Sequence, residues 1–217
     1  IYLPPCDPTK IICIHLNYDS RRVEFRAPPL TTPTYFQKPL TALNAHKGEL
    51  VKPEGYTYVN YEGEMAVVFG KVTKNVTREE AWDCIAGFAP ANDFGCHDFR
   101  DTDSGSMLRV KGMDGFCPVG PGIVRGVDVR QSTLRTILNG KVVQEDEVAN
   151  MTFGIDYQLA DLCRGSLFAA HRDRWPQVFA LLAEVVGEQR ARSNSLANAC
   201  PICRAGFPDA LALIKHL

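Results

Sequence analysis

The chain has 217 residues, a formal net charge of −1, and 45% hydrophobic residues. This length suits one domain or one domain with an appended piece, and the composition supplies enough apolar material for a sizeable core. The near-neutral charge argues against nucleic acid or anionic lipid as a partner, and no apolar run is long enough to span a membrane.

The first 52 residues are rich in proline and turn-forming residues. The apolar run Ile11–Ile14 predicts one strand, which leads into the segment that starts at His15. Pro28, Pro29 and Pro33 argue against a helix in the segment that follows. We therefore expect a strand followed by a proline-rich loop.

Residues 56–70 have the pattern of a strand. Tyr58, Asn60, Glu62 and Glu64 recur at a spacing of two, which places them on one face. The run from Met65 to Phe69 is continuously apolar, as in a strand that is buried on both faces.

Further elements follow along the chain. Residues 77–80 form a capping box that predicts a short helix through Ile85, with Gly87 as its end. Asn139-Gly140 predicts a hairpin, and residues 155–163 carry a helical apolar stripe. Because sheet material dominates, the fold class is expected to be mainly β (α+β) with short helices.

Glu62 and Glu64 are the most informative local feature. Two carboxylates on one face of a strand repel and raise each other's pKa unless a cation lies between them. Oxygen ligands favour magnesium, manganese or calcium over zinc. Solvated carboxylates on an exposed strand are the alternative interpretation of this pair alone.

Four motifs resemble the fumarylacetoacetate hydrolase family. The run from Tyr61 to Val68 resembles its YExELAVV element, and Ala91-Asn92-Asp93 follows about thirty residues later. Residues 111–121 match its KxxDGFxPxGP element, and residues 36–39 resemble its FxKP element. The resemblance covers roughly residues 8–164, and the segment from Asn92 resembles the branch of 2-hydroxyhepta-2,4-diene-1,7-dioate isomerases and associated decarboxylases.

The resemblance implies a site and a chemistry. Glu62, Glu64 and Asp93 would hold Mg²⁺ or Mn²⁺, which would chelate a 2-oxo acid, and Lys111 would help to stabilise an enolate. Arg100, Arg109 and Lys38 are candidates for binding a distal carboxylate of the substrate. The resemblance also implies a mixed β-sandwich roll and a homodimer.

The chain departs from the family at an acid–base pair. Many relatives carry NYxxHxxE, whereas residues 17–24 here retain Glu24 but have Arg21 at the histidine position. Arginine cannot act as a general base near neutral pH, so activation of water for hydrolysis is disfavoured. His97, close to Asp93 in sequence, is the candidate for proton transfer, with a structural histidine as the alternative.

After Arg164 the resemblance stops, and residues 178–186 predict a helix. Residues 171–176 can be encoded by codons that, read from the second base, give Ile-Ala-Thr-Gly-Gly-Pro, close to the family's Ile-Ala-Thr-Gly-Thr-Pro. We infer either an out-of-frame tail or a divergent native one. The expected organisation is an N-terminal segment (1–52), a metal-binding catalytic core (53–164) and an atypical helical tail (165–217).

The cysteines and the chain start bear on location. Six of the eight cysteines have no paired spacing, which is typical of reduced, buried thiols in the cytosol. Cys200 and Cys203 form a CxxC with only His216 nearby, so a zinc site lacks ligands. The start has neither an initial Met nor the features of a signal peptide, so we expect a cytoplasmic protein whose chain is a fragment or a processed form.

The expected function is that of a metal-dependent isomerase or decarboxylase acting on a 2-oxo (2-hydroxydiene) dicarboxylic acid in the catabolism of aromatic compounds. The alternatives are a carbon–carbon hydrolase of acylpyruvate or fumarylpyruvate type, and a metal-binding remnant that is inactive because of its altered tail.

Overall fold

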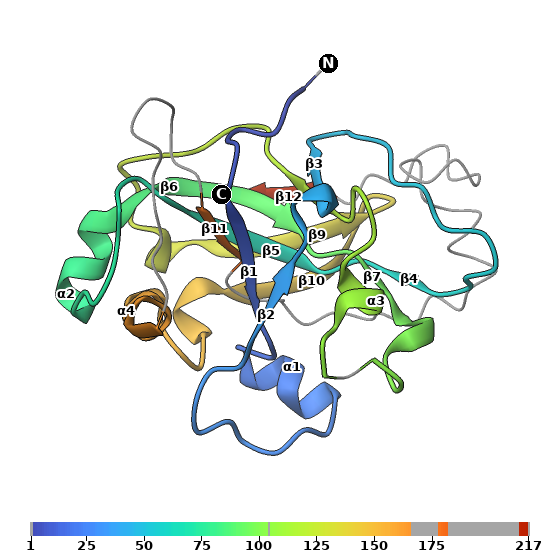
Figure 1. The fold of residues 1–217 in the computed structure, drawn as a ribbon, viewed down its shortest axis with the longest axis horizontal. Helices are drawn as coiled ribbons and strands as arrows, with labels where there is room; N and C mark the ends of the chain where they lie inside the picture. Colours follow the sequence, from blue (N-terminus) through green and yellow to red (C-terminus); the bar gives the residue numbers. More distant parts are fainter. Residues whose placement is uncertain (1, 104, 166–177, 182–212, 217) are drawn as a thin grey trace.

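The computed structural model describes residues 2–103, 105–165, 178–181 and 213–216. These residues form three sheets with a few short helices, so the expected mixed α+β, strand-rich class is confirmed (Figure 1). None of the helices in these ranges is long and apolar enough to cross a membrane.

The largest sheet has seven strands in the order β2-β1-β11-β5-β6-β8-β3. Strands of the N-terminal segment therefore lie in the same sheet as strands of the expected core. The bounds are β1 Lys10–Ile14, β2 Tyr35–Lys38, β3 Leu43–Ala45, β5 Gly63–Phe69, β6 Ile85–Asn92, β8 Cys117–Val119 and β11 Val178–Leu181.

Two smaller sheets and the helices complete the described fold. The second sheet consists of β9 Thr133–Leu138, β10 Lys141–Glu147 and β12 Leu213–His216, and the third of β4 Val59–Asn60 and β7 Gly95–Cys96. The α-helices are α1 Asp19–Glu24, α2 Arg78–Ala81, α3 Leu108–Lys111 and α4 Ile155–Gly165. The 3-10 helices are η1 Leu40–Ala42, η2 Trp82–Cys84, η3 His97–Phe99, η4 Val129–Gln131 and η5 Val148–Asn150.

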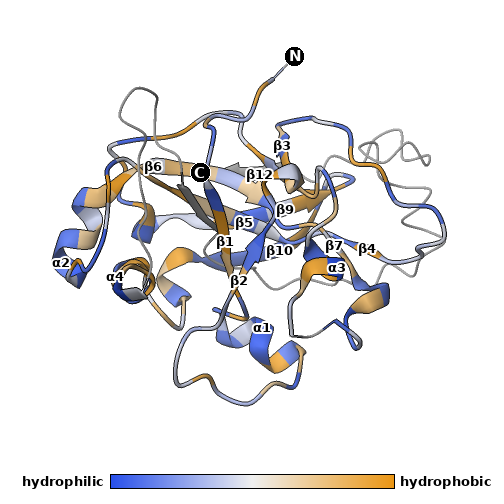
Figure 2. Cartoon of the chain, in the orientation of Figure 1, coloured by the Kyte–Doolittle hydropathy of each residue, from blue (hydrophilic) through white to orange (hydrophobic). Residues whose placement is uncertain are grey.

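The core lies on both faces of β5. Met65, Val67 and Phe69 belong to one buried cluster, whereas Ala66 and Val68 belong to another. This alternation confirms the strand over residues 65–69 that was expected to be buried on both faces. The single strand predicted over residues 56–70 is wrong, because the segment breaks at residues 61–62 and β4 and β5 pair in different sheets. Figure 2 shows mostly hydrophobic residues along the neighbouring β6, whereas α1 and α2 also carry hydrophilic residues.

Several local predictions are confirmed. The strand at residues 11–14 lies within β1, and the helix at 155–163 lies within α4. Thr77 caps α2 in a capping box with Glu80. Asn139 and Gly140 turn between β9 and β10 with positive φ angles of 52° and 77°, as a two-residue hairpin turn requires. The six cysteines outside the CxxC are free, and five of them are buried.

The predicted end of the second helix is wrong. The α-helix ends at Ala81, a 3-10 turn continues to Cys84, and β6 begins at Ile85. Gly87 therefore lies within a strand, where it pairs with Val68 of β5. A Cβ atom at Gly87 would lie 2.4 Å from the Val124 carbonyl oxygen, so the glycine permits close strand contact rather than helix termination.

The helical prediction for residues 178–186 is wrong over residues 178–181, and residues 182–186 lie outside the described residues. The strand β11 pairs in parallel with β1 and antiparallel with β5. A short apolar run such as Val-Phe-Ala-Leu fits either a buried strand or a helix, and here backbone pairing on both sides decides for the strand. Residues 171–176, Cys200 and Cys203 lie outside the described residues.

Candidate metal centre and pocket

The pairing of β5 with β6 brings the three acidic residues together. Gly63 pairs with Asn92, and the Asp93 backbone N–H donates to the Glu62 carbonyl oxygen over 2.8 Å. The Glu62 N–H donates in turn to Asn92 Oδ1 at 2.9 Å. Sheet register, rather than sequence proximity, therefore places Asp93 beside the Glu62-Gly63-Glu64 segment.

The three carboxylates form a buried cluster. Glu62, Glu64 and Asp93 are 5%, 1% and 1% exposed, and one ligand oxygen from each lies within 4.8 Å of the others. The solvated-strand interpretation of Glu62 and Glu64 is therefore wrong, because both side chains are buried. Buried carboxylates at this spacing require cations, and an all-oxygen donor set fits Mg²⁺ or Mn²⁺.

Two lysines supply part of the positive charge. Lys38 Nζ, at the end of β2, contacts Asp93 Oδ1 and lies 3.1 Å from the Phe94 and Phe116 carbonyl oxygens. Lys111 Nζ, at the end of α3, contacts Glu62 and lies 3.1 Å from Asp93 Oδ2. Three carboxylates against two ammonium groups leave one net negative charge in this cluster, so the donor set fits a divalent cation.

The electrostatics of Glu62 reflect these neighbours. Burial by itself raises the pKa of Glu62, but the Lys111 ammonium and a hydrogen bond from His97 outweigh it and lower the pKa below its ordinary value. Glu62 is therefore ionised at neutral pH, as a metal ligand must be.

His97 supports Glu62 from the side. Its Nε2 lies 3.4 Å from Glu62 Oε1 and 3.4 Å from Asn60 Nδ2, and its ring makes an edge contact with Tyr58. A Cβ atom at Gly95 would lie 3.1 Å from this imidazole, so glycine allows the close approach. The arrangement holds Glu62 in a fixed orientation.

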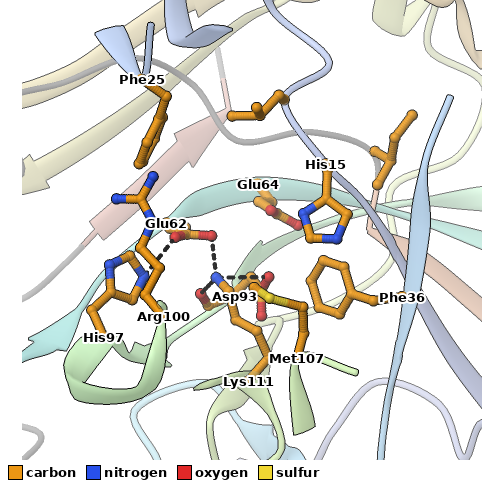
Figure 3. Close-up of a pocket in the computed structure, with 12 residues that line it drawn as sticks. His15, Phe25, Phe36, Glu62, Glu64, Asp93, His97, Arg100, Met107 and Lys111 are labelled. Atoms are coloured by element: carbon orange, nitrogen blue, oxygen red, sulfur yellow. Dashed lines mark hydrogen bonds and ion pairs between the residues drawn. The ribbon is translucent and has the colours of Figure 1, made fainter. Parts of the chain in front are cut away.

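A pocket opens at the cluster (Figure 3). Besides the acidic residues, its walls are partly aromatic and aliphatic, with cationic side chains among them. The lining residues are Ile14, His15, Leu16, Phe25, Phe36, Glu62, Glu64, Asp93, His97, Arg100, Met107 and Lys111.

The structure separates the three candidates for binding a distal carboxylate. Arg100 lines the pocket, with its guanidinium 3.8 Å from the Phe25 ring centroid. Arg109 lies over the Phe99 ring at 5.1 Å and is absent from the pocket lining. Lys38 is fully buried against Asp93. Arg100 is thus the candidate of these three that faces the pocket.

Arg21 and Glu24 form a pair with each other. Arg21 is fully buried on α1, and its Nη1 donates to Glu24 Oε2 at 2.5 Å. The Arg21 guanidinium also lies 4.0 Å from the Phe25 ring centroid. Glu24 does not line the pocket, so its predicted catalytic role has no supporting contact in the described residues.

Six residues of the pocket lining were not predicted from the sequence: Ile14, His15, Leu16, Phe25, Phe36 and Met107. His15 directly follows β1 and Phe36 lies in β2, so an imidazole just after a buried strand was a usable signal. Met107 was not recognisable, because it reaches the pocket through a left-handed conformation (φ 57°) at the start of α3.

Gly63→Ala is expected to destabilise the protein by about 1–3 kcal/mol. A Cβ atom at Gly63 would lie 1.7 Å from Thr136 Oγ1, and Thr136 is fully buried on β9. Urea unfolding measures the loss in the free energy of unfolding. Gly122→Ala is the matched control, because a Cβ atom at Gly122 would have nothing within 4 Å. Equal stability of the two variants would contradict the expected overlap.

Residues 10–170 match the sequence profile of the family described as Fumarylacetoacetate (FAA) hydrolase C-terminal. This match covers more than half of the chain, and the chain therefore belongs to the fumarylacetoacetate hydrolase family. The match also continues a few residues beyond Arg164, where the resemblance was expected to end.

The chain is similar to enzymes of this family. It is 33% identical, over 70% of its length and 36% of the relative's, to the 4-hydroxyphenylacetate degradation bifunctional isomerase/decarboxylase of Salmonella dublin. The structure of 2-hydroxyhepta-2,4-diene-1,7-dioate isomerase from Mycobacterium marinum matches with a TM-score of 0.74 and 31% identity, covering 85% of this chain and 67% of that one.

A third likeness concerns the fold alone. Fumarylpyruvate hydrolase from Pseudomonas aeruginosa, solved in complex with Mn²⁺ and pyruvate, matches with a TM-score of 0.72 at 20% identity, over 84% of this chain and 82% of that one. The chain spans 36% to 64% of the length of the first curated relatives that it matches.

Proposed function

We propose that this protein is a divalent-metal-dependent isomerase or decarboxylase that acts on a 2-oxo (2-hydroxydiene) dicarboxylic acid in the catabolism of aromatic compounds. The observation that carries the proposal is the buried cluster of Glu62, Glu64 and Asp93 at the pocket. The similarity to a bifunctional isomerase/decarboxylase and to a diene-dioate isomerase supports the substrate class.

The residues suit 2-oxo acid chemistry. A dication held by Glu62, Glu64 and Asp93 would polarise the 2-oxo group and offset negative charge on its oxygen. Lys111 lines the same pocket and supplies a second positive charge for the developing oxyanion. Arg100 is the proposed partner for the distal carboxylate, since a guanidinium fork matches carboxylate geometry.

Arg21 favours isomerisation or decarboxylation over hydrolysis. The family resemblance assigns a water-activating histidine to this position, and a guanidinium paired with Glu24 cannot take a proton near neutral pH. Tautomerisation and decarboxylation require no activated water. The hydrolase is therefore the second candidate.

Thermal unfolding tests the metal site. The midpoint is expected to rise with Mn²⁺ and again with Mn²⁺ plus oxalate, which mimics a 2-oxo carboxylate. A ligand at a hundred times its Kd adds about 2.7 kcal/mol to the free energy of unfolding. No response to metal would contradict the proposal.

Turnover assays then separate the candidate reactions. Isomerisation of 2-hydroxyhepta-2,4-diene-1,7-dioate, followed by its ultraviolet absorbance, is expected, with little or no hydrolysis of acetylpyruvate. Metal binding without turnover of any 2-oxo acid would instead support the inactive remnant, and restoring the in-frame tail should then recover activity. The homodimer and the cytoplasmic location belong to the same proposal, and sedimentation velocity tests the dimer.

A further inference from the structure

His15 places a second imidazole in the pocket, on the side of the carboxylate cluster opposite His97 (Figure 3). Its backbone N–H donates to the Thr34 carbonyl oxygen at 2.9 Å. Its ring packs in a tilted arrangement on the Phe36 ring, with 4.6 Å between the centroids. These contacts fix the imidazole between the end of β1 and the adjacent β2.

The two imidazoles differ in their hydrogen bonds. His97 Nε2 faces Glu62 Oε1 and Asn60 Nδ2, so His97 is engaged in orienting a carboxylate of the cluster. The His15 ring makes no hydrogen bond to any residue in the ranges 2–103 and 105–165. Its nitrogens are therefore available to a molecule bound in the pocket.

The charges around His15 favour its neutral form. Burial lowers the pKa of His15 below its ordinary value, and the Lys111 ammonium lowers it further. The carboxylates of Asp93 and Glu62 oppose this shift without reversing it. A neutral imidazole carries a free lone pair and can accept a proton from carbon.

We propose that His15 is the catalytic residue that exchanges a proton with the substrate carbon activated by the 2-oxo group, and that His97 is a positioning residue for Glu62. This inference rests on the proposed function, and it assigns to His15 the proton-transfer role for which His97 was a candidate from the sequence.

Pyruvate is the simplest 2-oxo acid with a carbon that is activated by the 2-oxo group and carries hydrogen. A methyl C–H bond breaks and its proton passes to the His15 imidazole. The electron pair of that bond forms the C2–C3 double bond, and the carbonyl π pair moves onto the 2-oxo oxygen. The reverse step returns a proton to C3, which in D₂O is a deuteron.

Hydrogen exchange into pyruvate tests this role. With the full chain and saturating Mg²⁺ in D₂O, loss of the pyruvate methyl signal in ¹H NMR gives the exchange rate. His15→Gln is expected to slow exchange by about a hundredfold or more, while the oxalate-dependent rise in the unfolding midpoint stays as in the wild type.

His97→Gln provides the contrasting result. It is expected to raise the metal concentration for half-maximal stabilisation by about 10–100-fold, while exchange at saturating metal is retained. His46→Gln is the matched control, because His46 lies outside the pocket, against Tyr2. Wild-type exchange in His15→Gln would overturn the inference.

The remaining outcomes are also distinguishable. A wild-type protein that binds oxalate but exchanges no pyruvate hydrogen overturns the role of His15 and leaves the metal site intact. A wild-type protein that responds to neither metal nor oxalate overturns the proposed function and this inference together.

A second variant and a direct measurement test the role of His15 even if His15→Gln does not fold. His15→Asn repeats the exchange assay. The ¹H NMR spectrum of whichever variant folds lacks one imidazole Cε1–H resonance, which assigns that resonance to His15. The same resonance is then followed in the wild type. A shift of this resonance when oxalate is added with Mg²⁺ is expected. A resonance that does not move would place His15 outside the substrate site and overturn the inference.

Discussion

Glu64→Gln is expected to weaken Mn²⁺ binding by at least about a hundredfold, since removal of mere supporting partners of a metal ligand already costs about 10–100-fold. Gln keeps the shape and one oxygen of Glu64 but removes its charge. The two remaining carboxylates, Glu62 and Asp93, are then balanced by Lys38 and Lys111, which removes the electrostatic demand for a dication.

Isothermal titration with Mn²⁺, together with thermal unfolding in EDTA and in Mn²⁺, measures this effect. The variant should lose mainly the stabilisation that Mn²⁺ adds to the free energy of unfolding, because one of three mutually repelling carboxylates is neutralised. Glu54→Gln is the matched control, since Glu54 is exposed on a turn. Undiminished Mn²⁺ affinity in Glu64→Gln would remove Glu64 from the site.

Lys111→Met is expected to destabilise the metal-free protein by about 3–5 kcal/mol, and Mn²⁺ should recover part of that loss. Lys111 is 3% exposed, and its ammonium contacts Glu62 and Asp93. Met fills a similar volume but leaves these buried carboxylates with one cation fewer. A dication among the same carboxylates replaces the missing positive charge.

Urea unfolding in EDTA and in saturating Mn²⁺ gives the two stabilities. The difference between wild type and Lys111→Met should shrink in Mn²⁺, while turnover of the 2-oxo acid stays low, because the charge beside the substrate oxygen is gone. Lys141→Met is the control, as Lys141 is exposed. If Lys111→Met lowers the free energy of unfolding by the same amount with and without Mn²⁺, Lys111 acts only through packing.

Local patterns predicted many of the strands and turns. The apolar run from Met65 to Phe69, the Asn139-Gly140 turn and the Thr77 cap were predictable, because each depends on neighbouring residues and on a fixed backbone geometry. The wrong predictions for Gly87 and for residues 178–181 arose because contacts distant in sequence determine these segments. Both segments are shaped by backbone pairing with β5, a partner distant in sequence.

The candidate site was likewise predictable where it depends on local spacing and not where it depends on long-range pairing. Glu62 and Glu64 were predicted as a pair because a strand repeats every two residues. The resemblance to a family added Asp93 and Lys111, but the register of β5 and β6 brings Asp93 to Glu62. The engagement of Lys38 with Asp93 also depends on strands that meet only in the folded chain.

Residue types and local motifs were enough to indicate the family, the strand-rich class, the Glu62 and Glu64 pair and the arginine at position 21 where many relatives have histidine. Each of these properties is carried by residues close together in the chain. The folded chain was needed to show which side chains face the pocket: Arg100 but not Arg109, and His15 opposite His97 (Figure 3). The direction of a side chain depends on sheet register and on packing between segments far apart in the chain, which no local pattern encodes.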